Sequence, residues 1–186
     1  SGGMYLLDSD HNIKNTLTVD AGAYPVTIKT GDGTVFQPTS GSVKGELQLV
    51  NGKGSFASSG EDKFYGVKFY QKSLDQLALS FRDTFNALNQ FEGTDKPLFT
   101  GNDAASLQIS EAWKQDAGYL TNTTGGAGGA NDNILRMIGA FDENGFDDMV
   151  IGLNSEIAID VKNHTDGLKS SDAVLASISQ QRESVS

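Results

Sequence analysis

The chain has 186 residues, a formal net charge of −10 and no cysteine. This length suffices for one ordinary domain, or for one domain with a small appendage. The acidic balance argues against nucleic acid and against insertion into anionic membranes, because both need a basic patch. The lack of cysteine excludes disulfides, thiol nucleophiles and cysteine-based zinc sites, and no segment approaches the roughly 20 apolar residues of a membrane span.

Residues 1–60 are expected to form a β-rich segment followed by a loop. Residues 16–19 and 26–29 are short runs rich in β-branched side chains, which favour strands. The sequence Gly31-Asp32-Gly33 between two such runs indicates a hairpin. Residues 40–49 fit either a short helix or a strand, and residues 51–60 have the composition of a flexible loop.

Residues 61–91 predict the first of two long helices. The segment has no proline and one glycine. Its apolar or semi-apolar residues, with Thr84 between Phe81 and Leu88, recur at alternating steps of three and four, as in a coiled coil. A core helix of a compact domain is the open alternative. We call the positions expected to pack against a partner helix the first apolar row: Val67, Tyr70, Leu74, Leu77, Phe81, Leu88 and Phe91.

Residues 92–145 are expected to form an irregular region inserted between the two helices. Within it we expect a short strand at 107–109, one or two helical turns at 111–115, a linker-like loop at 121–130 and a helix at 134–141 that Asn131 or Asp132 caps.

Residues 146–184 predict the second long helix. Its helical spacing is looser than in the first helix, with polar interruptions at His164 and Ser171. We call its apolar positions the second apolar row: Val150, Leu153, Ile157, Val161, Leu168, Leu175 and Ile178.

These elements predict an α+β fold that is mainly α. Two long helices would pair antiparallel across the inserted region, because they are separated by a compact stretch of chain. The expected domains are residues 1–60 and a helical rod of residues 61–186 that carries the insertion at 92–145.

No constellation in the sequence predicts catalysis, a cofactor site or a metal site. His11 lies in a polar turn, and His164 lies on the second helix without further metal ligands. The acidic stretch 142–148 resembles part of a calcium loop, but the twelfth position from Asp142 is Leu153, where an EF-hand requires glutamate. The chain is therefore expected not to be an enzyme.

Several segments together resemble the flagellar hook-associated protein 1 (FlgK) family. The Leu-Asp-x-Leu-Ala pattern of that family has its counterpart in residues 73–81, followed by an asparagine-containing helix end at 85–89. Residues 97–107 resemble the family's Leu-Phe…Ala-Ala…Leu segment, and residues 131–135 its short helix after a glycine-rich loop. Residues 181–186 resemble the start of the motif that leads into the family's terminal helices.

This resemblance, over roughly residues 40–186, implies a secreted, extracellular structural protein of the bacterial flagellum. Such a protein forms the hook–filament junction as a ring-like assembly with itself. Its partners would be the hook protein, the second junction protein and an export chaperone. Because the family's polymerising terminal helices have no counterpart in this sequence, we expect the chain to be mainly monomeric in dilute solution.

Two other functions stay open at this point. The chain could be another axial flagellar protein, either the second junction protein or a flagellin. It could instead be a surface adhesin or carbohydrate-binding module, with the β-rich residues 1–40 as its binding face.

Overall fold

The computed structural model describes residues 4–7, 10–125 and 129–185, and it has the predicted α+β, mainly α fold. The chain forms two compact units, Ser1–Leu74 and Asp75–Ser186. The boundary between them lies inside a long helix, whereas the sequence pattern suggested residue 60. Of the linker expected at 121–130, residues 126–128 lie outside the described residues.

The first unit begins with an antiparallel sheet of four strands in the order β1-β2-β3-β4. These strands are β1 (Met4–Leu7), β2 (Ile13–Asp20), β3 (Thr27–Thr30) and β4 (Val35–Phe36). Strands β2 and β3 pair so that Val19 faces Ile28, and Ile28 is the buried apolar residue of the sheet. The β-rich character predicted for the first forty residues is therefore correct.

The hairpin predicted around Gly31-Asp32-Gly33 joins β3 to β4. Its turn is closed by the Thr30 amide, which donates to the Thr34 carbonyl at 2.9 Å, and by the Gly33 amide, which donates to the Thr30 carbonyl. The Asp32 side chain accepts two hydrogen bonds, one from the Thr30 hydroxyl at 2.6 Å and one from the Thr34 amide at 3.0 Å. Gly33 has a φ of +86°, a conformation that glycine adopts without strain.

Helix α1 (Gly41–Asn51) settles the ambiguity at residues 40–49 in favour of a helix. Its last residue holds the sheet: the Val26 amide donates to the Asn51 side-chain oxygen, and the Asn51 side-chain nitrogen donates to the Val26 carbonyl, both at 2.8 Å. A short 3-10 helix, η1 (Gly54–Phe56), follows inside the segment expected to be a flexible loop. The ring of Phe69 packs so closely on Gly54 that a Cβ atom there would lie 2.7 Å from it.

Helix α2 (Val67–Leu88) is shorter at both ends than the predicted span 61–91. Residues 61–66 do not enter the helix because they pack against the end of α1: a Cβ at Gly66 would lie 2.4 Å from the Leu49 carbonyl oxygen. At the other end Phe91 lies beyond the helix, in a turn that Glu92 and Gly93 form with positive φ. The Thr94 amide donates to the Phe91 carbonyl at 2.9 Å and closes that turn.

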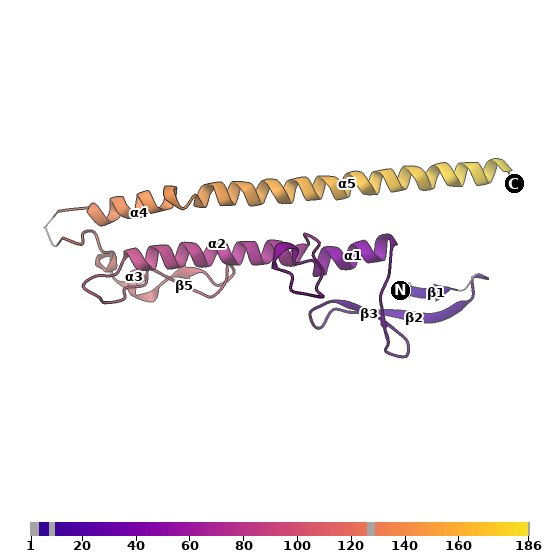
Figure 1. The fold of residues 1–186 in the computed structure, drawn as a ribbon, viewed down its shortest axis with the longest axis horizontal. Helices are drawn as coiled ribbons and strands as arrows, with labels where there is room; N and C mark the ends of the chain where they lie inside the picture. Colours follow the sequence, from indigo (N-terminus) through magenta and orange to yellow (C-terminus); the bar gives the residue numbers. More distant parts are fainter. Residues whose placement is uncertain (1–3, 8–9, 126–128, 186) are drawn as a thin grey trace. The chain divides into compact units, whose positions relative to one another are not determined.

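The second unit contains the rest of α2 and all later elements. These are β5 (Phe99–Thr100), β6 (Gln108–Ile109), α3 (Glu111–Gln115), the 3-10 helix η2 (Ala117–Tyr119), α4 (Asp132–Glu143) and α5 (Phe146–Val185). The strand predicted at 107–109 and the helices predicted at 111–115, 134–141 and 146–184 are thus confirmed. Within this unit α5 runs opposite to the α2 segment, as predicted (Figure 1).

Glycine and serine set the boundaries of the helices in the second unit. Gly145, with a φ of +61°, separates α4 from α5, because a left-handed residue ends a helix. The Ser110 hydroxyl accepts the Trp113 amide at 3.2 Å and caps α3. Buried apolar side chains from several of these elements form the core of the unit: Ala78, Leu98, Met137 and Phe146.

Candidate functional site

The first apolar row is divided between the two units. Val67, Tyr70 and Leu74 belong to the first unit, where Val67 and Leu74 are exposed and Tyr70 is half-buried. The members in the second unit, Leu77, Phe81, Leu88 and Phe91, are all half-buried.

Phe81 stands at the centre of an aromatic cluster in the second unit. Its ring centroid lies 4.6 Å from Phe85, 5.0 Å from Phe99 and 5.5 Å from Phe146. Trp113 extends the cluster, with its ring perpendicular to Phe99 at 5.7 Å. Such tilted and edge-on pairs add about 0.5–1.5 kcal/mol each beyond the area they bury. The cluster therefore joins α2, the inserted region and the start of α5.

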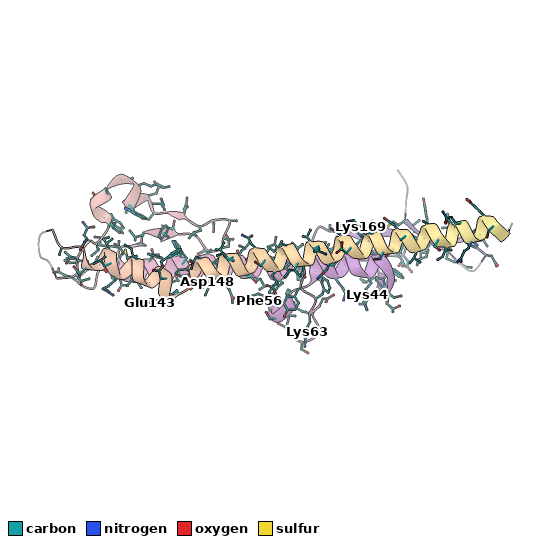
Figure 2. All side chains as sticks on the ribbon, turned by 90° about the horizontal axis from the view of Figure 1, so that it is seen from above. Lys44, Phe56, Lys63, Glu143, Asp148 and Lys169 are labelled. Carbon is teal, nitrogen blue, oxygen red and sulfur yellow. The ribbon has the colours of Figure 1, made fainter. Side chains whose placement is uncertain are left out.

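The second apolar row lies on α5 and is largely exposed. Leu153 and Ile157 are half-buried, whereas Val150, Val161, Leu168, Leu175 and Ile178 are exposed, Leu168 to 68%. From residue 161 to residue 184 every side chain of the helix is exposed. Figure 2 draws the side chains along α5, including Asp148 and Lys169.

The two rows do not meet along their length within the second unit. The part of α2 in this unit, residues 75–88, is about 20 Å long, whereas the 40 residues of α5 span about 60 Å at about 1.5 Å per residue. Most of α5 therefore extends past the available α2 surface. Packing of α5 against the members of the first row that belong to the first unit stays a prediction.

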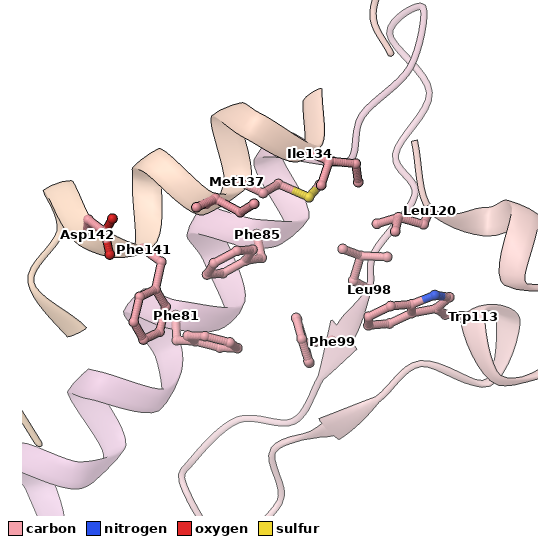
Figure 3. Close-up of a pocket in the computed structure, with 11 residues that line it drawn as sticks. Phe81, Phe85, Leu98, Phe99, Trp113, Leu120, Ile134, Met137, Phe141 and Asp142 are labelled. Atoms are coloured by element: carbon pink, nitrogen blue, oxygen red, sulfur yellow. The ribbon is translucent and has the colours of Figure 1, made fainter. Parts of the chain in front are cut away.

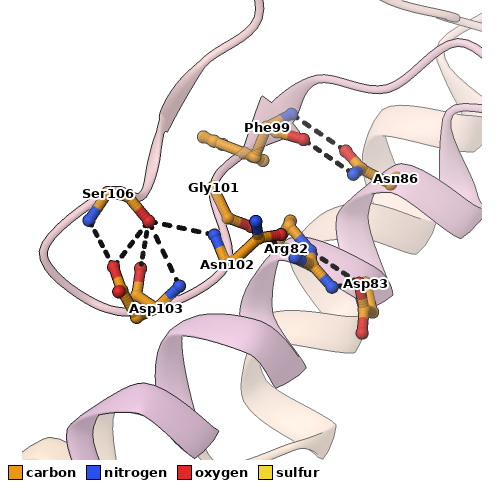
Figure 4. Close-up of polar contacts among 8 residues, drawn as sticks. All are labelled: Arg82, Asp83, Asn86, Phe99, Gly101, Asn102, Asp103 and Ser106. Carbon is orange, nitrogen blue, oxygen red and sulfur yellow. Dashed lines mark hydrogen bonds and ion pairs between the residues drawn. The ribbon is translucent and has the colours of Figure 1, made fainter.

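Polar side chains on α2 hold the inserted region in place, and sequence reasoning missed them. The Asn86 side-chain nitrogen donates to the Phe99 carbonyl at 2.8 Å, and its oxygen accepts the Phe99 amide at 2.9 Å (Figure 4). The Arg82 guanidinium donates to the Gly101 carbonyl. Asp75 accepts the Ala104 amide at 2.9 Å, so this carboxylate is a structural acceptor for the inserted region.

Asn89 is fully buried at the end of α2. Its side-chain nitrogen donates to the Lys96 carbonyl at 2.7 Å and to the Tyr119 carbonyl at 3.1 Å, and its oxygen accepts the Thr121 amide at 2.7 Å. The Thr121 hydroxyl donates to the Asn89 carbonyl at 2.9 Å. One carboxamide thus satisfies three backbone groups of a segment that has no strand or helix partner of its own.

Asn133 of α4 likewise hydrogen-bonds backbone groups of other segments. It is also fully buried, and its side-chain nitrogen donates to the Thr121 carbonyl at 2.7 Å and to the Leu88 carbonyl at 2.9 Å. We call the hydrogen bonds of Asn86, Asn89 and Asn133 the asparagine network. Its sequence signal is weak: two asparagines three residues apart on a helix lie on one face, but nothing local says that a distant backbone will meet them.

Beside this network lies an apolar groove with a volume of about 420 Å³. Phe81 and Phe85 of α2, Phe99, Trp113 and several side chains of α4 line it (Figure 3). The α4 residues Ile134, Met137, Ile138 and Phe141 fall on one helix face because their steps are three, one and three. Asp142 is the charged residue of the lining. We call this feature the aromatic groove.

Short turns lower the pKa of several carboxylates. The Ser106 hydroxyl and amide donate to Asp103 (Figure 4) and hold the pKa of that carboxyl below its usual range. Donors from Thr123 and Thr124 lower the pKa of Asp132. In the first unit the ion pair with Lys53 and the Ser58 amide lower the pKa of Glu61. These carboxylates order loops, because each accepts at least two hydrogen bonds in its charged form.

The residues considered for catalysis or metal binding remain apart. His11 is exposed in a turn with a φ of 63°, and His164 is exposed on α5. The acidic stretch 142–148 forms the end of α4, the Asn144-Gly145 connection and the first turn of α5. Over residues 4–7, 10–125 and 129–185, no group of three or more histidine or acidic side chains could hold a metal ion. The helices described for this chain include none that is long and apolar enough to cross a membrane.

Comparisons with protein-family models, with curated proteins and with solved structures gave no match. The candidate functional features come from the structure itself: the exposed second apolar row and the aromatic groove.

Proposed function

We propose that this chain is a structural, self-associating segment of the bacterial flagellum that contributes to the hook–filament junction. The observation that carries the proposal is the exposed second apolar row on a 40-residue helix. Apolar side chains that recur along one face of a long helix are typical of helix–helix association. The resemblance of residues 73–107 to the hook-associated protein 1 family supplies the biological setting.

The energetics favour association in an ordered assembly over a stable pair in dilute solution. Full burial of an aliphatic side chain gives about 1.5–3 kcal/mol, so the four exposed members from Val161 to Ile178 on two helices contribute on the order of 12 kcal/mol at the lower value. Association costs an estimated 4–15 kcal/mol. His164 and Ser171 interrupt the row and reduce the gain. The burial gain is thus similar in size to the cost of association. Contacts between two copies are weak, and they become strong when many copies align.

The proposed partners are other copies of the chain in a ring, the hook protein and the second junction protein, with an export chaperone before secretion. The location is extracellular, on the flagellum. The net charge of −10 opposes premature association because copies repel each other at low ionic strength.

The decisive test is deletion of the gene in its host, followed by imaging of the flagella. We expect hooks without filaments, with flagellin released into the medium. Normal filaments would end the proposal. Complementation with Leu168→Glu, which places a charge in the second apolar row, should restore filaments poorly. Ala173→Glu, at an exposed α5 position outside the row, is the matched control and should restore them.

A biophysical test follows the same contact in vitro. Sedimentation velocity should show mainly monomer at low concentration and a growing associated fraction at high concentration and high salt, since salt screens the repulsion between acidic copies. Leu168→Glu should abolish that fraction and Ala173→Glu should preserve it. Equal association of the two variants would exclude the row as the contact.

A further inference from the structure

The aromatic groove has the shape and chemistry of a site for apolar side chains. Its volume of about 420 Å³ lies within the range of about 300–1,000 Å³ that ligand sites occupy. Rings from α2 and the inserted region line it (Figure 3), together with Ile138 and Phe141 of α4. Ile138 is 57% exposed, so an apolar residue of the lining remains in contact with solvent.

Carboxylates are concentrated in the stretch of chain where α4 ends and α5 begins, next to the groove residue Asp142. Asp142 lines the groove itself, and Glu143, Asp147 and Asp148 follow it closely in the chain. All four are exposed, and within the described ranges 4–7, 10–125 and 129–185 no ion pair involves any of them. An apolar site with an acidic rim is complementary to a partner with apolar anchors and nearby positive charge.

We propose that the aromatic groove binds an amphipathic helical segment of a partner protein, which inserts aromatic or branched aliphatic side chains and places Lys or Arg against the Asp142–Asp148 rim. This is the helix-in-groove mode, in which anchors at i, i+3, i+4 and i+7 enter an apolar groove. The proposal does not depend on the flagellar role, because it rests on the lining and charge of the second unit alone.

Two other occupants fit the groove less well. A second copy of the chain would bring a net charge of −10 toward an acidic rim, and its exposed helix α5 carries seven acidic and three basic residues. A small polar metabolite would need several converging polar groups, whereas the lining offers one carboxylate.

Trp113 allows a direct measurement of binding. It is the single tryptophan of the chain and lines the groove, so its emission reports on occupancy without a label. The probe is a helical peptide of about 16 residues, with Leu and Phe on one face and Lys on both flanks. Two control peptides have the same apolar face with Glu flanks, or the Lys flanks with a scrambled order that removes the apolar face.

Two pairs of variants test the groove and its rim. Ile138→Gln removes an anchor contact, and Leu135→Gln is its control, because Leu135 is 60% exposed on the same helix but does not line the groove. Asp142→Asn removes the rim charge, and Asp172→Asn removes an exposed charge of α5 far along the chain. Circular dichroism verifies that each variant keeps its helix content.

The expected result is saturable binding of the Lys-flanked peptide with a shift of Trp113 emission. Affinity should fall about tenfold in Ile138→Gln, as expected for losing burial of an aliphatic side chain. It should fall about threefold in Asp142→Asn and with added salt, as expected for an exposed charge pair, and it should be unchanged in both controls.

Several results would overturn the proposal. Equal binding of the Glu-flanked peptide would show that the acidic rim does not contribute to binding. Equal binding of the scrambled peptide would show that the apolar anchors do not contribute. Unchanged affinity in Ile138→Gln would place the peptide outside the groove. Self-association that Ile138→Gln abolishes would show that a second copy is the occupant. None of these results depends on the flagellar phenotype or on Leu168.

Discussion

Helices α2 and α5 differ in how much of their surface the rest of the chain covers. The part of α2 in the second unit is covered by its own chain: Asp75, Arg82, Asn86 and Asn89 hold the backbone of the inserted region by hydrogen bonds. Helix α5, by contrast, exposes every side chain from residue 161 to residue 184. One helix is completed by intramolecular contacts, and the other has an apolar face that the described chain does not cover.

The two helices differ in the polar residues that lie next to each apolar row. On α2 the polar residues at 75, 82, 86 and 89 are seven, four and three positions apart, so they form a stripe along one side of the helix. That stripe meets backbone amides and carbonyls that no strand or helix satisfies. On α5 the polar side chains from residue 161 to residue 184 are exposed and make no such set of contacts with an inserted region among the described residues. The following predictions test this contrast, in order of decreasing effect.

Asn89→Ala should have the largest effect on stability. It leaves the Thr121 amide and the Lys96 and Tyr119 carbonyls without their partner, and each unsatisfied buried group costs about 1–3 kcal/mol. We expect a loss of about 3 kcal/mol or more in the free energy of unfolding, measured by urea denaturation. Gln90→Ala, at the neighbouring exposed position, should change it by less than about 0.5 kcal/mol. Similar values for both variants would contradict the role of the asparagine network.

Asn133→Ala should cost about 2 kcal/mol by the same measurement, because two buried carbonyls lose their donor. Asn131→Ala, which removes an exposed asparagine just before α4, is the control. Because Asn89 and Asn133 share Thr121 as a partner, the double variant should lose less than the sum of the single losses. Strict additivity would mean that the two asparagines act independently.

Acidification should weaken the carboxylate-capped turns. The folded-state pKa values of Asp103, Asp132 and Glu61 lie below their ordinary values. Their contribution is therefore present above the ordinary pKa values, 3.8 for the two aspartates and 4.5 for Glu61, and is lost as pH falls through the lowered folded-state values. In an NMR titration, Ser106→Ala should raise the pKa of Asp103 toward its ordinary value and leave that of Asp132 unchanged. An unchanged pKa of Asp103 would show that Ser106 does not stabilise the charged form.

Leu168→Glu should have the smallest effect on the stability of the isolated chain. Leu168 is 68% exposed, and substitutions at exposed positions usually change the free energy of unfolding by less than about 0.5 kcal/mol. The same variant should abolish self-association. A large loss of stability at low protein concentration would mean that α5 packs on its own chain, and the contrast between the helices would fail.

The sequence predicted the elements whose physics is local. The three-and-four spacing of apolar residues identified α2, a looser helical spacing identified α5, and the capping residues at 131–132 identified α4. The glycine turn identified the β3–β4 hairpin. The helix start at Val67 could not be predicted in the same way, since residues 61–66 are diverted by Gly66 packing against the end of α1. Phe91 continued the periodic pattern, but Asn89 directs its side chain to the inserted region and α2 ends before it.

The candidate sites depended on contacts that no local pattern encodes. The sequence identified the apolar face of α5, but periodicity does not say whether the chain itself covers such a face. The aromatic groove combines Phe81, Trp113 and Phe141, which are tens of residues apart. The asparagine network likewise joins Leu88 to Asn133 across 45 positions.

Thr121 has a consequence for the order in which the second unit folds. Its amide donates to Asn89 and its carbonyl accepts from Asn133. The irregular segment that contains Thr121 therefore links the end of α2 to α4. Asn133 donates both to Leu88 of α2 and to Thr121, so α4 acquires its full polar anchor only when the backbone at Thr121 has also reached α2. Pulse-labelled hydrogen exchange should therefore find the Thr121 amide proton protected no later than the amides of α4. Protection of this single proton would then report when the segment docks on α2 during folding of the second unit.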